Sequence, residues 1–431
     1  MPTAYGRILR RPGALRFSVA GLLARFPMSM VGISSILAIQ DLYGSYSAAG
    51  AVSAANIVAA AVGAPLLARM VDAHGQARVM VPALVASSAS LLALAVAAQH
   101  RAALWSLIAL SALTGALSGS MGSLVRSRWT ALLESPDDIH TAFSLEAALD
   151  ETAFMIGPVL ATALCTTPAL PVTSGWIAAM ALQTGGGLWF LSQRATEPAL
   201  HPRRRRTARP GRGAVERGQG LDAPAPTSHR PVLGHGAVAS IVVIFLTSGA
   251  MFGANDVTVV AFATELGQKP AAGAALAAWA AGSFLAALAY GSRSWGWPLW
   301  KQLAAGALAL ALGASTFAVA PNLAVVSGLY ALTGLAIAPT ITSGNNIVQV
   351  TVAPSQLTEG LAWVSTALNI GVSLGSMVAG RVLDASGSRG GYLLVAGFAW
   401  TGAAVAAGSL PILRRVRTHS RIPLEGRADE R

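Results

Sequence analysis

Three carboxylates lie close together in an otherwise apolar stretch, SLEAALDETAFMIGPVLATAL at residues 144–163. Glu146 and Asp150 are four residues apart and would share one face of a helix, whereas Glu151 points about 100° further round. A charged residue inside a membrane-spanning helix costs about 2.5–3.5 kcal/mol on insertion scales. These acids therefore need basic partners or water, and the chemistry open to them is the uptake and release of protons.

A structural interpretation of the three acids rests on two arginines. Arg126 and Arg128 lie at the end of the preceding apolar stretch, on the side where the acid-bearing stretch begins. In this interpretation Glu146 pairs with Arg126 or Arg128, and the cluster merely fixes the cytoplasmic gate.

A functional interpretation concerns Asp150 and Glu151, which would face a central cavity. Arg25, in LLARFPMSM, lies inside an apolar stretch and would be their neighbour. Burial favours a neutral carboxyl group and a nearby guanidinium favours the carboxylate, so a group balanced between the two can exchange a proton. Asp256, beside Asn255 in SGAMFGANDVTVVAF, is a fourth acid of this kind. It is a candidate proton or cation site toward the outer side, or it caps the outer end of its helix with Asn255.

The composition predicts a membrane protein. The chain is 54% hydrophobic and 11% charged, with a mean hydropathy of +0.57. Soluble domains carry about 25% charged residues, so there is too little charge here to cover a soluble surface. Backbone polar groups in lipid must be satisfied within the segment, which favours helices. The expected fold is therefore an all-α polytopic membrane protein with twelve transmembrane helices, at about 17–38, 47–69, 79–98, 103–125, 142–165, 172–193, 237–261, 271–291, 301–319, 323–349, 360–382 and 391–413.

The chain divides into two halves around a basic linker. Residues 194–235 are rich in Pro, Gly and Arg, which is typical of a disordered segment. We therefore expect six helices in residues 1–193, six more in residues 236–413, and a tail at 414–431. AAGAVSAAN near the start of the second predicted helix resembles AAGAALAAW in the eighth, and repeated halves around a central site are frequent in transporters.

The distribution of charge predicts the orientation. Most of the thirty basic residues fall in the two termini, the linker and the loops on the same side of the predicted spans. Short loops rich in Arg and Lys stay in the cytoplasm, so both termini and the linker are expected to be cytoplasmic, in a bacterial cell membrane. Since topology accounts for the net charge of +12, no nucleic-acid partner is expected.

The link between the second and third predicted helices, GAPLLARMVDAHGQARVMV, resembles the signature loop of the major facilitator superfamily. Asp72 and Gly75 take the places of its acid and glycine, and Arg69 and Arg78 are the flanking cations. Alanine stands at position 68, where the family usually has glycine. The resemblance implies two pseudo-symmetric six-helix bundles and a gate in which Asp72 accepts hydrogen bonds from a neighbouring helix N-terminus.

Gly157 and Pro158, in GPVLA, resemble part of the helix-five motif of drug–proton antiporters in this superfamily. The resemblance implies a proton gradient as the energy source, with no cofactor. Further polar or aromatic side chains could line a substrate cavity or could simply pack between helices: Phe252, Asn255, Trp279, Asn345, Asn346, Trp363 and Asn369.

Several chemistries are not supported by the sequence. It contains no GxxxxGK[ST] loop for ATP and no HExxH metal motif, and Cys165 is its single cysteine, so neither an enzyme nor a metal protein is expected. The favoured function is proton-coupled export of a small apolar or amphipathic compound by a monomer in the bilayer. The alternatives are a proton-coupled importer or facilitator of a metabolite, and a membrane sensor or scaffold that transports nothing.

Overall fold

The computed structural model describes residues 4–198, 232–291, 296–352 and 357–416. These residues form helices and turns, with no strand among them, in agreement with the expected all-α fold. Most of the predicted linker and tail lies outside the described residues, so the domain boundaries stay predictions.

The first group of helices covers the N-terminal half of the chain. It comprises α1 (Ala4–Leu9), α2 (Ala14–Tyr43), α3 (Tyr46–His74), α4 (Gln76–Gln99), α5 (Leu104–Ser118), α6 (Met121–Leu132), α7 (Pro136–Thr166), α8 (Ser174–Ser192) and the short η1 (Arg194–Thr196). Local signals set the boundaries. For example, α2 ends at Gly44, whose φ of 68° favours glycine, and Ser45 then caps α3 by accepting a hydrogen bond from the backbone of Ala48.

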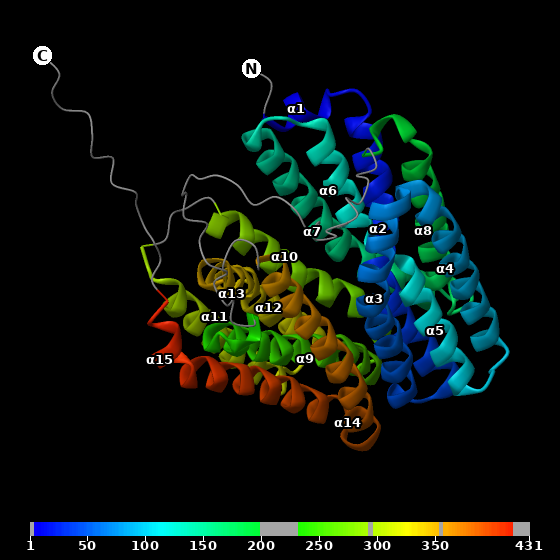
Figure 1. Ribbon diagram of the computed structural model, residues 1–431. Helices are drawn as coiled ribbons and strands as arrows, with labels where there is room; N and C mark the ends of the chain where they lie inside the picture. The colour runs from blue at the N-terminus through cyan, green and yellow to red at the C-terminus, as the bar shows by residue number, and fades with distance from the viewer. Residues whose placement is uncertain (1–3, 199–231, 292–295, 353–356, 417–431) are drawn as a thin grey trace, which may run out of the picture.

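The second group follows the predicted linker. It comprises η2 (Val232–Gly234), α9 (Gly236–Glu265), η3 (Lys269–Ala271), α10 (Ala272–Gly291), α11 (Leu299–Phe317), α12 (Leu323–Gly334), α13 (Ile337–Thr351), α14 (Leu357–Gly408) and α15 (Leu410–Leu413). Figure 1 shows the two groups side by side, with α2 to α8 on the right and α9 to α15 on the left.

Within the described residues, nine helices are long and apolar enough to cross a membrane. The expected number of twelve stays a prediction: α14 counts once although it covers two predicted spans, and α8 and α11, which cover two others, are not among the nine. At Gly387 the backbone of α14 leaves the helical conformation with a φ of 66°, and Figure 1 shows the chain reversing there. The next residue, Ser388, donates its backbone N–H to Glu265 at 2.7 Å, so α9 holds this corner in place.

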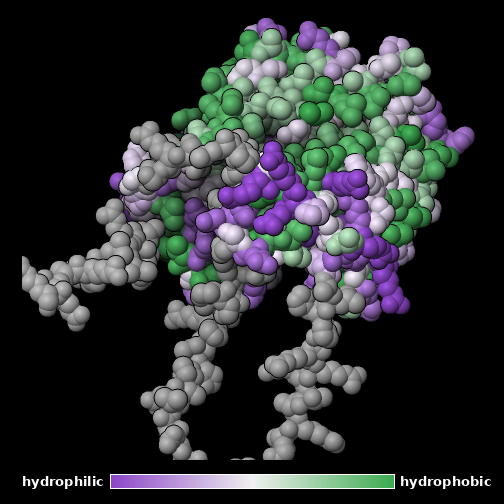
Figure 2. Space-filling view, turned by 90° about the horizontal axis from the view of Figure 1, so that it is seen from above, coloured by the Kyte–Doolittle hydropathy of each residue, from purple (hydrophilic) through white to green (hydrophobic). Residues whose placement is uncertain are grey.

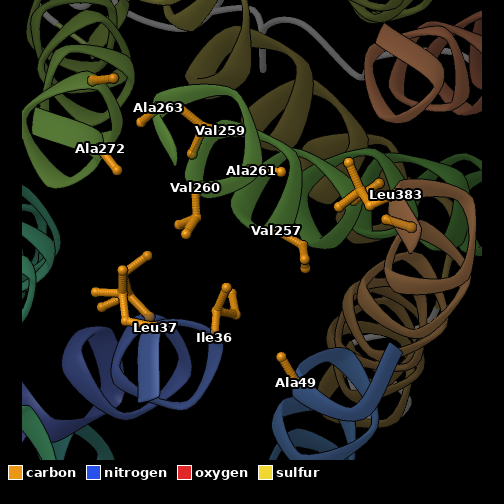
Figure 3. Close-up of a cluster of buried hydrophobic side chains, with 14 of the residues drawn as sticks. Ile36, Leu37, Ala49, Val257, Val259, Val260, Ala261, Ala263, Ala272 and Leu383 are labelled. Carbon is orange, nitrogen blue, oxygen red and sulfur yellow. The ribbon is translucent and has the colours of Figure 1, made fainter. Parts of the chain in front are cut away.

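The two groups share one apolar core at only one end, which we call the joined end. There, Ile36 and Leu37 of α2 belong to the same buried cluster as Val257 and Val260 of α9 and Leu383 of α14 (Figure 3). At the other end, which carries α1 and α15 and which we call the open end, the core is divided. One buried cluster lies wholly in the first group, with Phe17, Trp129 and Phe190, and another lies wholly in the second, with Ile241, Phe245 and Ile347.

This division of the core agrees with the arrangement in space. The groups meet near the turn of α14 and diverge toward their open ends in Figure 1. Seen from above, hydrophilic residues gather near the middle of the face while hydrophobic residues cover much of its flank (Figure 2). The structure is therefore closed at the joined end and separated at the open end.

Close packing of α3 against α14 holds the joined end together. A Cβ atom built on Gly50 would lie 2.4 Å from the carbonyl oxygen of Ser376, and one on Gly380 would lie 2.4 Å from that of Tyr46. Only glycine permits this approach, because real Cβ contacts are never so short.

Polar contacts between the groups also lie at the joined end. Asp384 of α14 accepts hydrogen bonds from the backbone N–H groups of Tyr46 and Ser47, at 2.8 and 2.9 Å, and from the hydroxyl of Ser45. It therefore caps the positive N-terminus of α3 across the boundary between the groups. Lys269 likewise reaches across to Asp41 at 3.1 Å.

Gly380→Leu is expected to open the joined end, since the added side chain must push α3 away from α14. Overpacking of this kind costs about 1–3 kcal/mol, enough to change the ratio of two conformations about tenfold. The measurement is the distance between two spin labels in a Cys165→Ala background. The labels are attached at His100→Cys and Ser386→Cys, one in each group near the joined end. A longer distance component should appear.

Gly397→Leu is the matched control for this experiment, because a Cβ atom at Gly397 would meet nothing within 4 Å. It should leave the distances unchanged. If both variants give the distances of the unaltered chain, close packing of α3 on α14 does not hold the joined end.

Candidate functional site

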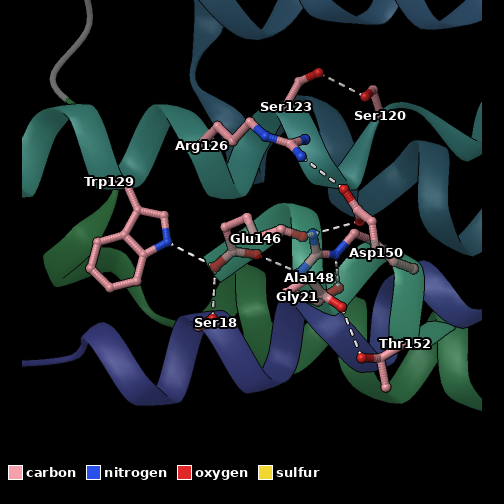
Figure 4. A network of polar contacts seen from close by, with 11 residues as sticks. Ser18, Gly21, Ser120, Ser123, Arg126, Trp129, Glu146, Ala148, Asp150 and Thr152 are labelled. Carbon is pink, nitrogen blue, oxygen red and sulfur yellow. Dashed lines mark hydrogen bonds and ion pairs between the residues drawn. The ribbon is translucent and has the colours of Figure 1, made fainter. Parts of the chain in front are cut away.

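A buried network of charges joins α2 to α7 at the open end of the first group (Figure 4). Arg25 of α2 lies between two carboxylates of α7: its Nη2 is 2.5 Å from Glu146 and its Nη1 is 2.7 Å from Asp150. The side chain of Arg25 is 3% exposed and that of Glu146 is not exposed at all. Each charge is therefore held away from water and depends on its partners.

Glu146 is fully occupied by donors. While one carboxylate oxygen binds Arg25, the other accepts from the Ser18 hydroxyl at 2.7 Å and from the Trp129 indole at 2.8 Å. Trp129 is itself buried and packs edge-on against Phe17, with ring centroids 4.8 Å apart. This environment holds the Glu146 carboxylate in a fixed position, which is a structural role.

Asp150 occupies a different position at the edge of the network. One of its oxygens binds Arg25, and the other binds Arg126 of α6 at 2.8 Å. The side chains of Asp150 and Arg126 are 22% and 33% exposed. Two arginines are thus balanced by two carboxylates, and the outermost ion pair is the one that water reaches.

The expected pairing of Glu146 with Arg126 or Arg128 is wrong. Arg25 is its partner, and Arg126 binds Asp150. Positions 126 and 128 are two residues apart, so their side chains point about 200° apart and only one can face α7. The side chain of Arg128 points the other way. It donates a hydrogen bond to the Gln76 side chain at 2.9 Å and stacks on the Phe190 ring.

Arg128 instead binds together the open end of the first group. Besides Gln76 at the start of α4, its guanidinium donates to the Gln193 carbonyl and the Thr196 hydroxyl, both at 2.9 Å, and lies 3.8 Å from the ring centroid of Phe190. It therefore links α6, α4 and the end of α8.

Glu151 has no hydrogen-bond or ion-pair partner within the part of the chain that the structure describes, and it is half-buried. It precedes Pro158 by seven residues, about two turns, and so shares its face of α7. The Pro158 carbonyl would lie 2.4 Å from a Cβ atom on Gly273 of α10. Glu151 therefore lies on the side of α7 that faces the second group, two turns nearer the open end.

Asp256 lies in α9, the first long helix of the second group. It is half-buried, and no hydrogen bond or ion pair of its side chain occurs among the described residues. Phe252 and Val260 lie four residues before and after it, on the same face, and Val260 packs with Ile36 and Leu37 of α2 in the shared core. Asp256 therefore lies on the same face of α9 as these two residues, one turn from each.

The alternative that Asp256 and Asn255 cap the end of their helix is wrong, because α9 continues to Glu265. Asn255 points into the second group, where it accepts a hydrogen bond from Tyr330 at 2.5 Å, and it is 2% exposed. Tyr330 also contacts the hydroxyl of Tyr392 at 3.3 Å.

The other candidate cavity residues differ in how they are packed. Trp279 is 9% exposed and packs with Phe252, Phe317 and Tyr330, at centroid distances of 6.3, 5.6 and 4.8 Å. It thus belongs mainly to the packing of the second group. The remaining four are partly or largely exposed and make no side-chain hydrogen bond with other described residues: Asn345, Asn346, Trp363 and Asn369.

The backbone of the signature loop takes up a conformation that favours glycine at Gly75. Gly75 has a φ of 95° and donates its N–H to the Val71 carbonyl at 2.7 Å. Arg69, Asp72 and Arg78 are exposed and form no ion pair with described residues. The gate contact expected of Asp72 is therefore not made in this conformation, which is separated at that end.

Gly157 and Pro158 have distinct packing roles in α7. A Cβ atom on Gly157 would lie 2.0 Å from the Ser29 hydroxyl of α2, which donates to the Ala153 carbonyl at 2.8 Å. Gly157 thus brings α7 against α2, while the Pro158 carbonyl meets α10.

Sequence reasoning missed several residues of these contacts. Ser18 and Trp129 carry no pattern that would link them to Glu146, since they come from separate helices. Asp384 was recognisable as an acid near a predicted helix end, but its partner on α3 was not. Among the described residues, no group of three or more His, Cys, Asp or Glu side chains could hold a metal ion.

A comparison with known proteins finds a matching family model. The family model described as Major Facilitator Superfamily matches residues 17–313. The structure resembles the nucleoside transporter NupG, at 14% identity and a TM-score of 0.68, over 94% of this chain and 99% of that one. It also resembles a bacterial homologue of the human lysosomal transporter Spinster in an inward-facing and occupied conformation, at 12% identity and a TM-score of 0.70, over 94% and 98% of the two chains.

A third likeness is to the human organic anion transporter MFSD10, at 14% identity and a TM-score of 0.59, over 92% of this chain and all of that one (100%). At such identities these likenesses show a common fold. A search of curated proteins gives no match.

Arg25→Gln is expected to destabilise the chain strongly, because it leaves Glu146 buried without its cation. Breaking a buried pair in this way costs about 3–5 kcal/mol, whereas Arg126→Gln removes a partly exposed pair worth about 1 kcal/mol or less. The measurement is the melting temperature of the purified protein in detergent, followed by tryptophan fluorescence. Arg25→Gln combined with Glu146→Gln should recover part of the loss. Equal melting temperatures for Arg25→Gln and Arg126→Gln would contradict this account.

Proposed function

Because the chain belongs to the major facilitator superfamily of transporters, we propose that it is a secondary active transporter that exchanges protons for an exported compound. The compound is small and amphipathic or largely apolar. The two helix groups rock about a central site, so that access alternates between the two sides of the membrane. We place both termini in the cytoplasm of a bacterial cell, on the basis of the charge distribution, and expect a monomer.

The division of the apolar core supports the rocking motion. The groups are packed together at the joined end and separated at the open end, which carries α1 and α15. With cytoplasmic termini, the open end faces inward, and the structure resembles the inward-facing Spinster homologue. When the groups rock, Asp384 would leave the N-terminus of α3, while Asp72 at the other end of α3 approaches the start of α14 at Leu357.

The balance of charge among the buried acids and arginines is the observation that supports proton coupling. Arg25 and Arg126 are matched by Glu146 and Asp150, so the network is neutral. Glu151 and Asp256 are left over, half-buried in α7 and α9, with no side-chain partner among the described residues. An unpaired acid at such a place takes up a proton or a cation more readily than one that already has an arginine partner.

Asp150 provides a way to connect proton uptake to movement. Its carboxylate is shared between a buried and a partly exposed arginine, and protonation would remove the negative charge that holds both. Arg126 would then be free to leave α7. Such a release at the open end alters the contacts of α6 and α7, which flank the space between the groups.

The same balance favours a neutral or positively charged substrate. The leftover charge of Glu151 and Asp256 is negative, and Phe252 adds an apolar face one turn from Asp256. An anionic compound would need free cations there, and both arginines of the network are already paired.

Uptake of a polar metabolite is the second candidate function. Asn345 and Asn346 of α13 have no side-chain hydrogen bond to other described residues, so their amides are available to a polar ligand. In that case the transporter would be an importer or facilitator, and the unpaired acids would bind the coupling proton during uptake.

Proton exchange is tested in inside-out membrane vesicles with a respiration-driven pH gradient and a pH-sensitive dye. Addition of a panel of cationic, neutral and anionic amphiphiles should identify a compound that dissipates the gradient. Glu151→Gln or Asp256→Asn should lower that response at least about tenfold, because the loss of a proton site removes the coupling. Glu134→Gln, which changes an exposed acid between α6 and α7, is the control and should leave the response intact.

Two results would contradict export by proton exchange. One is a substrate response that survives in both Glu151→Gln and Asp256→Asn while all proteins are present at equal amounts. The other is a panel without any response, together with a labelled metabolite that equilibrates equally in all variants, which would favour the facilitator.

A further inference from the structure

A cavity of about 240 Å³ lies at the open end of the second group, away from the charge network. The start of α11, the end of α13 and α15 surround it. Its lining combines the indole of Trp300 and the guanidinium of Arg414 with the apolar side chains of Leu299, Ile347 and Leu413. The cavity therefore offers both a cationic and an apolar surface.

Two cations share the indole of Trp300. The Cζ of Arg414 lies 4.7 Å from the ring centroid and the Nζ of Lys301 lies 5.4 Å from it. The two charges are thus at most about 10 Å apart, which costs energy through their mutual repulsion. Neither forms an ion pair with any described acid, and the adjacent Arg415 is exposed and likewise unpaired in the described segments. An anion placed between these side chains would relieve the repulsion.

The backbone adds to the positive potential of the cavity. The first turn of α11 contains no acid, and its N–H groups are the positive end of a nineteen-residue helix. The N–H groups of Lys301 and Gln302 bond to the Pro298 carbonyl. Those of Leu299 and Trp300 precede them in the first turn, where no intrahelical acceptor exists.

We propose that this cavity binds the headgroup of an anionic phospholipid, with the phosphate held by Arg414, which lines the cavity, and by Lys301, which shares the Trp300 ring with it. The apolar side of the cavity suits the glycerol and the first methylene groups of the lipid. Trp297, which is 61% exposed, and Trp300 lie where α11 begins, as tryptophans do at the boundary between lipid and water. A free anion would use the cations but would gain nothing from this apolar and aromatic surface.

Native mass spectrometry of the purified full chain tests the proposal. Phosphatidylglycerol is compared with phosphatidylcholine of the same acyl chains, since only the first carries net negative charge. Basic residues near a membrane surface contribute about 1 kcal/mol each to the binding of anionic lipid. Lys301→Gln combined with Arg414→Gln should therefore lower retention of bound phosphatidylglycerol at least about tenfold and leave phosphatidylcholine unchanged.

The matched control is Arg381→Gln combined with Arg389→Gln. It removes the same charge from two exposed residues near the turn of α14, at the joined end, and should retain the lipid. Lys301→Arg combined with Arg414→Lys keeps both charges and should also retain it, which separates lost binding from lost folding.

Two outcomes would overturn the proposal. In one, both charge-removing pairs weaken phosphatidylglycerol equally, which is general electrostatic attraction. In the other, inorganic phosphate at the same concentration displaces phosphatidylglycerol, which identifies a site for free anions. Lipid retention that is lost only in Lys301→Gln with Arg414→Gln, and that resists phosphate, supports the lipid site.

Discussion

The contact between Arg25 and the two carboxylates of α7 is the interaction on which the rest of the first group depends. It fixes α2 against α7 at the open end, and the close approach at Gly157 continues that contact toward the joined end. These two helices then meet the second group, α2 through Ile36 and Leu37 and α7 through Pro158. The ion pairs therefore hold together two helices of the first group that also contact the second group.

The boundary is built differently at its two ends. At the joined end, small residues let α3 and α14 touch, and Asp384 neutralises a helix N-terminus. At the open end each group has completed its own apolar core, so separation exposes little apolar surface there. This arrangement allows the groups to part at one end without unfolding, since packed cores move as units and do not deform continuously.

Composition and charge spacing predicted much of the fold, because lipid imposes helices and apolar stretches of known length. The position of Arg25 inside a long apolar helix was also predicted from sequence. The partner of Glu146 was not predicted, because it depends on how α6 and α7 are rotated about their axes. The sequence does not determine this rotation, since apolar residues lie on every face of these helices. The cap expected at Asn255 was wrong for another reason: α9 continues to Glu265, and the partner of Asn255 is Tyr330, which lies 75 positions away in the sequence.

The acids with buried partners hold helices together, whereas the acids without partners are the ones with a proposed role in transport. Each acid inside a span costs about 2.5–3.5 kcal/mol on insertion scales, and Glu146 offsets that cost with three side-chain donors. Glu151 and Asp256 have no such donors among the described residues, so packing gains nothing from them that glutamine or asparagine would not supply. Both are half-buried in helices that contact the other group. The proposed role in binding a proton or a cation would account for the presence of these two acids in apolar helices.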